Sequence, residues 1–155
     1  MTLYQITDWL GLVPLCFVVG FGLLGLIQWM QRKKLSRVDR SLLVLGGFYI
    51  AVMAAYGLFE AITVNYRPVL INGVLEASYP SSTTMLVMCV IPTAIMQFRE
   101  RIKKPVLREC LLWAMAAFAV FMVIGRLVSG VHWLTDIIGG GMLSVGLVLL
   151  YRAIA

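Results

Sequence analysis

The chain of 155 residues is 61% hydrophobic and only 13% charged, and its mean hydropathy is +0.94. These values exclude a soluble globular domain, in which about a quarter of the residues are charged. The net charge of +6 does not indicate a nucleic-acid partner, because the basic residues are sorted along the chain in the manner of a membrane protein.

Five apolar segments have the length and composition of membrane helices. We expect these helices at roughly residues 10–30, 41–59, 77–98, 108–127 and 136–151. The last two have short apolar runs, so we expect them to bury the neighbouring polar residues Arg126 and Asp136 inside the bundle. The connections are too short to hold a soluble domain. The sequence therefore predicts an all-α, polytopic transmembrane helix bundle that forms a single integral membrane domain over residues 1–155.

The first apolar segment must be distinguished from a secretory signal peptide. Residues 1–9 contain Asp8 and neither Lys nor Arg, whereas the start of a signal peptide is basic. We therefore expect this segment to remain as a membrane helix.

The basic residues predict the orientation of the bundle. They follow the ends of the first, third and fifth segments: Arg32, Lys33, Lys34, Arg37, Arg40, Arg99, Arg101, Lys103, Lys104, Arg108 and Arg152. By the positive-inside rule these ends are cytoplasmic, so the N-terminus is expected outside and the C-terminus inside. Arg67 and Arg126 remain on the outer side, where this rule gives no reason for them. Polar residues at helix ends in a membrane favour a functional site, here on the extracytoplasmic side of a plasma membrane that we expect to be bacterial.

The cysteines show no pattern typical of a metal or redox site. Cys16, Cys89 and Cys110 fall in or beside apolar segments, and we expect buried packing thiols. The chain has one histidine, so a zinc site is not expected. We predict no metal and no other cofactor.

Two short polar stretches lie on the expected outer side. Asn65-Tyr66-Arg67-Pro68 follows the second segment, and Tyr79-Pro80-Ser81-Ser82-Thr83-Thr84 begins the third. Taken alone, Arg67 fits a surface arginine near lipid headgroups, and the Pro and Ser residues fit an ordinary helix start. A helix N-terminus with free amides and hydroxyls is also a ready anion site.

The third polar stretch, residues 125–136, is more informative. If the chain is helical after Val131, His132 and Asp136 lie one turn apart on the same face. A carboxylate there can accept from one imidazole nitrogen and leave the other free, which is how a histidine nucleophile or base is oriented. The alternative is a structural His–Asp pair without a catalytic role.

Taken together, the three stretches resemble the type 2 phosphatidic acid phosphatase superfamily. Its pattern consists of three motifs. The first is Lys, six intervening residues and Arg-Pro; the second is Pro-Ser-Gly-His; and the third is Ser-Arg, five residues, His, three residues and Asp. Arg67-Pro68 matches the end of the first motif and Pro80-Ser81 the start of the second. Arg126, His132 and Asp136 match the third motif with both gaps correct. The resemblance covers roughly residues 60–140.

Three positions depart from the family pattern. Glu60 stands in place of the lysine, Thr83 in place of the second-motif histidine, and Gly125 in place of the serine before Arg126. The first departure replaces a phosphate-binding cation by a carboxylate. The second removes the residue that protonates the leaving group in the family. These departures support an alternative in which the chain is a catalytically inactive family member that binds phospholipid or stabilises a partner.

The resemblance implies a metal-independent, two-step phosphoryl transfer. Arg67 and Arg126 would bind the phosphate oxygens, together with Ser81 and the amides of Ser81 and Ser82. His132, oriented by Asp136, would attack phosphorus and form a phosphohistidine that water then hydrolyses.

The expected substrate is an anionic lipid. A polyprenyl diphosphate is the leading candidate, and phosphatidate-like or phosphatidylglycerol-phosphate-like monoesters come second. Because Thr83 cannot supply the proton that an alkoxide leaving group needs, we expect diphosphates to be preferred unless Glu76 or Glu60 acts as a substitute acid. The sequence does not predict the oligomeric state.

Overall fold

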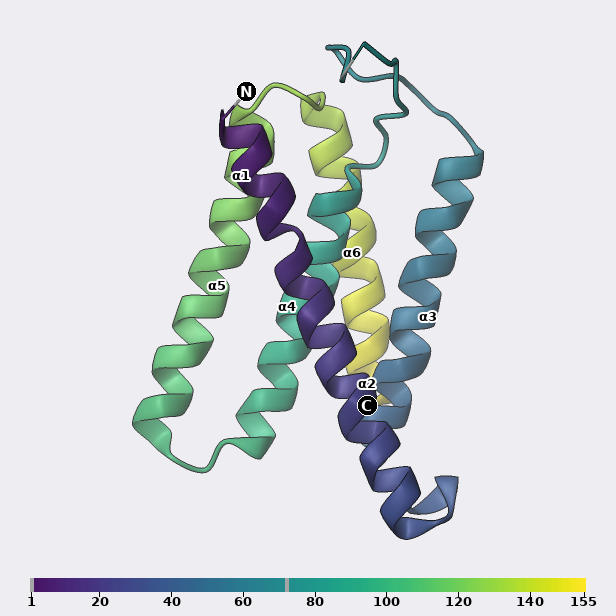
Figure 1. Ribbon diagram of the computed structural model, residues 1–155, viewed down its shortest axis with the longest axis vertical. Helices are drawn as coiled ribbons and strands as arrows, with labels where there is room; N and C mark the ends of the chain where they lie inside the picture. The colour runs from purple at the N-terminus through teal and green to yellow at the C-terminus, as the bar shows by residue number, and fades with distance from the viewer. Residues whose placement is uncertain (1, 72) are drawn as a thin grey trace.

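The computed structural model describes residues 2–71 and 73–155, and it confirms an all-α bundle. These residues form six α-helices, and Figure 1 shows them running roughly along the long axis of the molecule. They are α1 (Thr2–Leu10), α2 (Leu12–Arg32), α3 (Arg40–Ala61), α4 (Ser82–Arg101), α5 (Pro105–Val128) and α6 (Leu134–Ile154), with a short 3₁₀ helix, η1 (Leu35–Arg37), between α2 and α3. Each of the five expected segments forms a helix, and α5 and α6 bury Arg126 and Asp136 as expected.

Two helix boundaries differ from the expectation. The third helix begins at Ser82 instead of residue 77, because Ser81 has an extended conformation and its hydroxyl caps the helix by accepting from the Thr84 amide. The first helix extends upstream to Thr2, with a break at Gly11 that separates α1 from α2. The amide of Gly11 donates to the carbonyls of Thr7 and Asp8.

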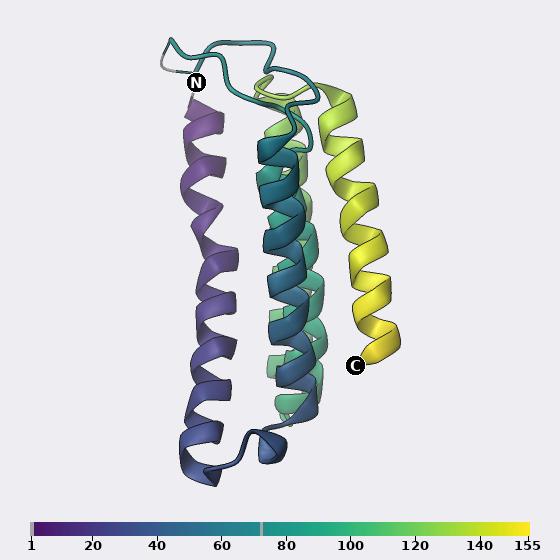
Figure 2. The same cartoon turned by 90° about the vertical axis from the view of Figure 1, so that its right-hand side faces the viewer.

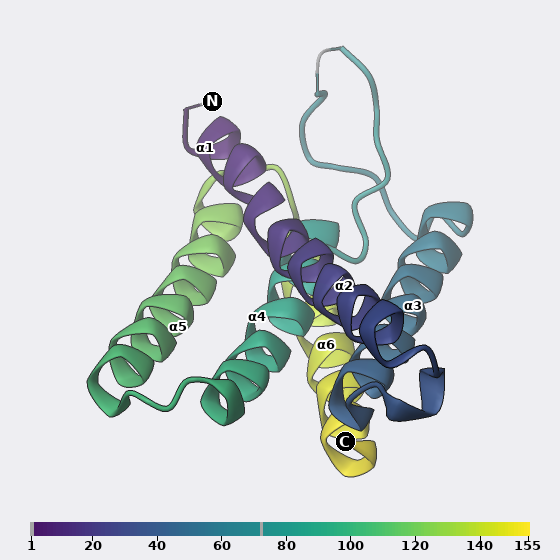
Figure 3. The same cartoon turned by 60° about the horizontal axis from the view of Figure 1, so that its bottom comes forward.

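Among the described residues, four helical segments are long and apolar enough to cross a membrane: Leu3–Arg32, Arg40–Ala61, Pro105–Val128 and Leu134–Ile154. α4 is not among them, yet it lies at the centre of the bundle and packs against α2, α3, α5 and α6 (Figure 3). Its residues Val87, Cys89 and Ala94 are fully buried. Because other helices surround α4, it can bury polar side chains such as Thr93 and Gln97 without exposing them to lipid.

The connections lie at two opposite ends of the bundle. We call the end formed by residues 62–81 and 129–133 the loop end, and the end formed by residues 33–39 and 102–104 the basic end. Figure 2 shows the long connection between α3 and α4 covering the loop end. Hydrogen bonds between Arg67 and Glu76, and between Ser78 and Asn65, hold its two halves together. The basic clusters and the candidate site residues are therefore at opposite ends, as the charge pattern predicts; which end faces the cytoplasm stays a prediction.

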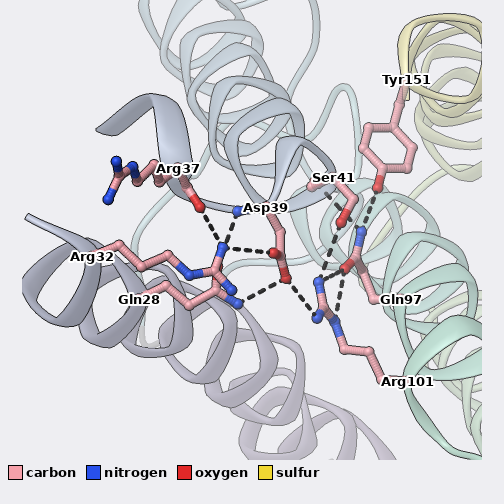
Figure 4. Close-up of polar contacts among 8 residues, drawn as sticks. All are labelled: Gln28, Arg32, Arg37, Asp39, Ser41, Gln97, Arg101 and Tyr151. Atoms are coloured by element: carbon pink, nitrogen blue, oxygen red, sulfur yellow. Dashed lines mark hydrogen bonds and ion pairs between the residues drawn. The ribbon is translucent and has the colours of Figure 1, made fainter. Parts of the chain in front are cut away.

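A polar network ties the helices together at the basic end (Figure 4). The Asp39 carboxylate accepts from Gln28 at 2.8 Å, from Arg32 at 3.1 Å and from Arg101 at 3.3 Å. Arg101 also donates to Gln97, whose amide donates to the Tyr151 hydroxyl at 2.9 Å. The hydrogen bond from Gln28, with those from Arg32 and Arg101, lowers the pKa of Asp39 below 3.8 against the opposing effect of burial. This network joins α2, α3, α4 and α6 far from the loop end.

Small residues in α6 permit close packing against the start of α4. A Cβ added at Gly139 would overlap the Tyr79 ring, and one at Gly140 would lie 3.2 Å from the Ser81 carbonyl oxygen. The N–H of Ser81 donates to the Asp136 carbonyl at 3.1 Å across the same interface. This close approach brings the segment before α4 against the first turn of α6.

The expectation of buried thiols holds at only one of the three cysteines. Cys89 is buried on the central helix α4. Cys16 and Cys110 are exposed on the outer surface of the bundle, because α2 and α5 each pack along one face and leave the opposite face uncovered.

Candidate active site

His132 lies in the turn between α5 and α6 and is 6% exposed. Its Nδ1 atom lies 3.1 Å from the Ser78 carbonyl oxygen and 3.1 Å from the Ser78 hydroxyl. The distance from Nδ1 to the Asp136 carboxylate is longer, 3.7 Å. The expected pairing of His132 with Asp136 is therefore indirect, with the Ser78 hydroxyl bridging the two side chains.

These contacts define the tautomer of His132. A carbonyl oxygen can only accept, so the hydrogen bond to Ser78 O requires a proton on Nδ1. The Ser78 hydroxyl donates to Asp136 Oδ2 in a short hydrogen bond, and it can accept from the same Nδ1–H. Nε2 is then the unprotonated nitrogen, and its lone pair is available to attack an electrophile.

Asp136 is fully buried and accepts hydrogen bonds from three parts of the chain. Oδ1 accepts from Asn65 at 2.9 Å. Oδ2 accepts from the Trp133 amide at 2.9 Å as well as from Ser78. The carboxylate therefore binds the α3–α4 connection, caps the first turn of α6 and fixes the bridge to His132.

The surroundings of His132 favour its neutral form. Burial, followed by the positive charges of Arg67 and Arg126, lowers the pKa of His132 from 6.5 to about 4. The negative charge of Asp136 opposes this shift but does not cancel it. At neutral pH the imidazole is uncharged, which is the form that a nucleophile requires.

Arg67 comes from the α3–α4 connection and its side chain is 13% exposed. Nε lies 3.1 Å from Glu76 Oε2, so the two groups form an ion pair. The N–H is not directed at the carboxylate well enough for a hydrogen bond, and Nε and Nη1 have no hydrogen-bond partner among the residues that the structure describes. Glu76 therefore holds Arg67 through charge, and guanidinium hydrogens remain for another acceptor.

Arg126, at the end of α5, is more deeply buried, with a side chain 4% exposed. Its Nη2 donates to Asp8 Oδ1 at 2.8 Å and to Thr83 Oγ1 at 2.6 Å. Nε and Nη1 lack hydrogen-bond partners within residues 2–71 and 73–155. Buried donors are nearly always paired, so two arginines with free N–H groups near one histidine indicate a site for an anion with several oxygens.

A cavity of about 540 Å³ opens beside Arg67 and His132, and Arg126 is not among the residues that line it. Arg67, Ser82 and His132 line it, together with Glu60 and Glu76. The structure therefore brings five of the sequence-predicted site residues to one cavity. A second cavity of about 310 Å³ shares Tyr56 and Ser82 with the first and is lined by Asp8 and Thr83.

Ser81 does not line either cavity. Its hydroxyl accepts from the Thr84 amide and its own amide donates to Asp136 O. The Ser81 amide that we expected to bind phosphate therefore already has an acceptor within the protein. The Ser81 hydroxyl hydrogen is not used by the bond from Thr84, and Ser82 is the neighbouring serine that lines the cavity.

Sequence reasoning missed two residues that connect to the nucleophile. Ser78 bridges His132 and Asp136, and Asn65 binds Asp136 from the other side. Both lie within or next to stretches singled out by sequence, two positions from Arg67 and from Pro80. Their partners are 54 to 71 residues away in the chain, and no local spacing reports such contacts. No group of three His, Cys, Asp or Glu side chains that could hold a metal occurs in the described part of the chain.

The chain belongs to the PAP2 superfamily, whose family model matches residues 59–155. Among solved structures, it is similar to a transmembrane PAP2 type phosphatidylglycerolphosphate phosphatase from Bacillus subtilis. The match has 22% sequence identity and a TM-score of 0.53, and it covers 94% of this chain and 76% of the other. No curated protein sequence matches. The family match and the shared fold confirm the resemblance that the three motifs indicated.

Proposed function

We propose that the chain is a membrane lipid phosphatase that hydrolyses a polyprenyl diphosphate, or a related phospholipid, at an extracytoplasmic site. The observation that carries this proposal is the grouping of a neutral, buried His132 with two arginines whose N–H groups are free. Family membership supports a phosphatase. The position of the site at the end opposite the basic clusters supports its extracytoplasmic location.

In the proposed reaction, the free guanidinium hydrogens of Arg67 and Arg126 bind the oxygens of the terminal phosphoryl group. The Nε2 lone pair of His132 forms a bond to phosphorus while the bond to the leaving oxygen breaks, and that oxygen keeps the electron pair. The imidazole becomes positively charged. The Ser78 carbonyl stabilises this charge through Nδ1–H, and so does Asp136 through the Ser78 hydroxyl.

Water then attacks the phosphohistidine, inorganic phosphate leaves, and Nε2 regains its lone pair. Each step uses only groups of this chain, water and the substrate, so we propose a reaction that is independent of metal ions. With a diphosphate substrate, the first leaving group is a lipid monophosphate, which is stable as an anion. The chain has Thr83, not an acid, beside Arg126, so a leaving group of this kind suits the site better than an alkoxide.

The test is phosphate release from a polyprenyl diphosphate by purified full-length protein in detergent with a chelator. His132→Ala should abolish turnover, whereas Thr135→Ala should match wild type because Thr135 is exposed on the same turn. With radiolabelled terminal phosphate, wild type should carry an acid-labile label that His132→Ala lacks. Turnover by His132→Ala equal to wild type would refute the phosphohistidine. Lipid binding without any turnover would favour the inactive family member, which Glu60 and Thr83 in place of the family residues also support.

A further inference from the structure

The N-terminal helix α1 lies outside the residues that match the family, yet two of its side chains contact Arg126. Asp8 accepts a hydrogen bond from Arg126 Nη2 at 2.8 Å. The guanidinium carbon of Arg126 lies 5.2 Å from the centre of the Tyr4 ring, within the range of a cation–π contact. Both partners lie more than a hundred residues before Arg126 in the chain, so α1 forms a wall beside Arg126 from outside the matched residues.

Two departures from the family motifs lie at this wall. A Cβ added at Gly125 would lie 2.6 Å from the Thr7 side chain, so a side chain at position 125 would require Thr7 to shift. Thr83, in place of the family histidine, accepts from the same Nη2 that binds Asp8. At positions 125 and 83, where the family has a serine and a histidine, this chain has a glycine and a threonine. In the same place, α1 supplies the Asp8 carboxylate to Arg126.

Asp8 and Thr83 determine which hydrogens of Arg126 stay free. Nη2 carries two hydrogens, and the two acceptors account for both. Nε and Nη1 are left, and their hydrogens have no acceptor among the residues that the structure describes. Each of these N–H groups can donate to a phosphate oxygen.

We propose that Asp8 is a positioning residue that holds the guanidinium of Arg126 in place, so that the N–H groups of Nε and Nη1 can donate to the phosphoryl group. Its consequence for catalysis rests on the proposed phosphatase function. The Asp8 side chain is 57% exposed, and an exposed ion pair alone is weak. Here the partner is a buried arginine, and removing its counter-charge leaves a buried cation free to move.

A positioning role predicts a particular kinetic signature. In Asp8→Ala, Arg126 still attracts the substrate, so KM should stay within about threefold of wild type. The transition state needs the Nε and Nη1 hydrogens of Arg126 in register, and a displacement of the order of 1 Å lowers kcat by roughly 10- to 100-fold. Asp8→Asn should retain more activity than Asp8→Ala because its amide oxygen can still accept from Nη2.

The experiment measures kcat and KM for Asp8→Ala, Asp8→Asn and wild type, with Gln5→Ala as the matched control because Gln5 is exposed on the same helix. Thermal unfolding in detergent checks that each variant is folded, and if Asp8→Ala is not, the isosteric Asp8→Asn decides. In addition, binding of orthovanadate and of inorganic phosphate is measured by calorimetry. Vanadate adopts the five-coordinate geometry of phosphoryl transfer, so its affinity should fall with kcat while phosphate affinity changes little.

The outcomes separate this proposal from the proposed function. A kcat for the Asp8 variants within about twofold of wild type, with vanadate affinity unchanged, overturns the role of Asp8 and leaves the phosphatase intact. If wild type turns over no lipid, the phosphatase proposal fails, and vanadate affinity still decides the role of Asp8. Weaker vanadate binding in Asp8→Ala then supports it, and equal binding overturns it.

Discussion

Replacing Ser78 by alanine should slow the reaction without removing the nucleophile. The change deletes the hydroxyl that donates to Asp136 and accepts from His132, but it keeps the Ser78 carbonyl that binds Nδ1–H. Asp136 is then separated from Nδ1 by 3.7 Å with nothing between them. Positive charge that develops on the imidazole loses its link to the carboxylate.

The size of this effect follows from the one hydrogen bond that disappears. A hydrogen bond to a charged group contributes about 1.5–3 kcal/mol, and each 1.36 kcal/mol changes a rate about tenfold. If the whole contribution is expressed in the transition state, kcat falls by roughly 10- to 150-fold. The assay is steady-state phosphate release from a polyprenyl diphosphate, with Thr135→Ala as control. A kcat for Ser78→Ala equal to wild type, in a folded protein, would show that the bridge has no part in the reaction.

Four further predictions follow from the charges and the topology. His132 is the single histidine, so one labelled imidazole signal should report its titration by NMR. We expect kcat/KM to fall only as the pH drops through about 4, because the protonated imidazole has no lone pair for attack. A titration midpoint near 6.5 would contradict the effect of its buried surroundings on the pKa of His132. Wild type should hydrolyse a polyprenyl diphosphate with higher kcat/KM than a phosphatidate, and Thr83→His should reduce the ratio of these two kcat/KM values by up to about 10²-fold. Equal turnover of both lipids by wild type, with no effect of Glu76→Gln or Glu60→Gln on phosphatidate hydrolysis, would refute the leaving-group reasoning. Single cysteines in residues 63–76 and 99–108, in a variant without the native thiols, should react with impermeant reagents from opposite sides of the membrane, and labelling from the same side would overturn the proposed orientation. Asp39→Asn should lower the Tm at pH 7, because the lowered pKa of Asp39 stabilises the folded protein above pH 3.8. This stabilisation is lost as the pH falls below 3.8 and Asp39 becomes protonated in the folded protein as well. A Tm difference between the variant and wild type that persists unchanged in acid would rule out this electrostatic cause.

The helices and the third motif were predictable because their signals are local. A run of apolar residues long enough to cross a membrane identifies a helix by itself. His132 and Asp136 are four residues apart, so their proximity depends only on the conformation of one turn. Arg67 and Arg126 stood out because they are cations on the side where charge placement does not call for them.

The contacts that complete the site could not be predicted in this way. Ser78 and Asp8 reach their partners through the packing of separate parts of the chain. Serine two positions before a proline, or aspartate near an N-terminus, is common in sequences without such roles. The start of α4 was placed too early because residues 77–81 are apolar or small, although they are not helical and Ser81 binds α6. Local composition does not distinguish a helical turn from an extended segment held by tertiary contacts.

The threefold hydrogen bonding of Asp136 limits what mutagenesis at this position can reveal. One carboxylate begins α6, fastens the α3–α4 connection and orients His132, and every group that reaches it is a donor. An asparagine of the same shape must turn its own NH₂ towards either Asn65 or the pair formed by Ser78 and the Trp133 amide. In both orientations a hydrogen-bond donor then faces another donor, and at least one hydrogen bond is lost. Asp136→Asn therefore perturbs the start of a membrane helix and a loop as well as the chemistry, so lost activity in that variant does not isolate a catalytic role. Ser78→Ala leaves the Trp133 and Asn65 contacts in place, and it is the cleaner probe of the same relay.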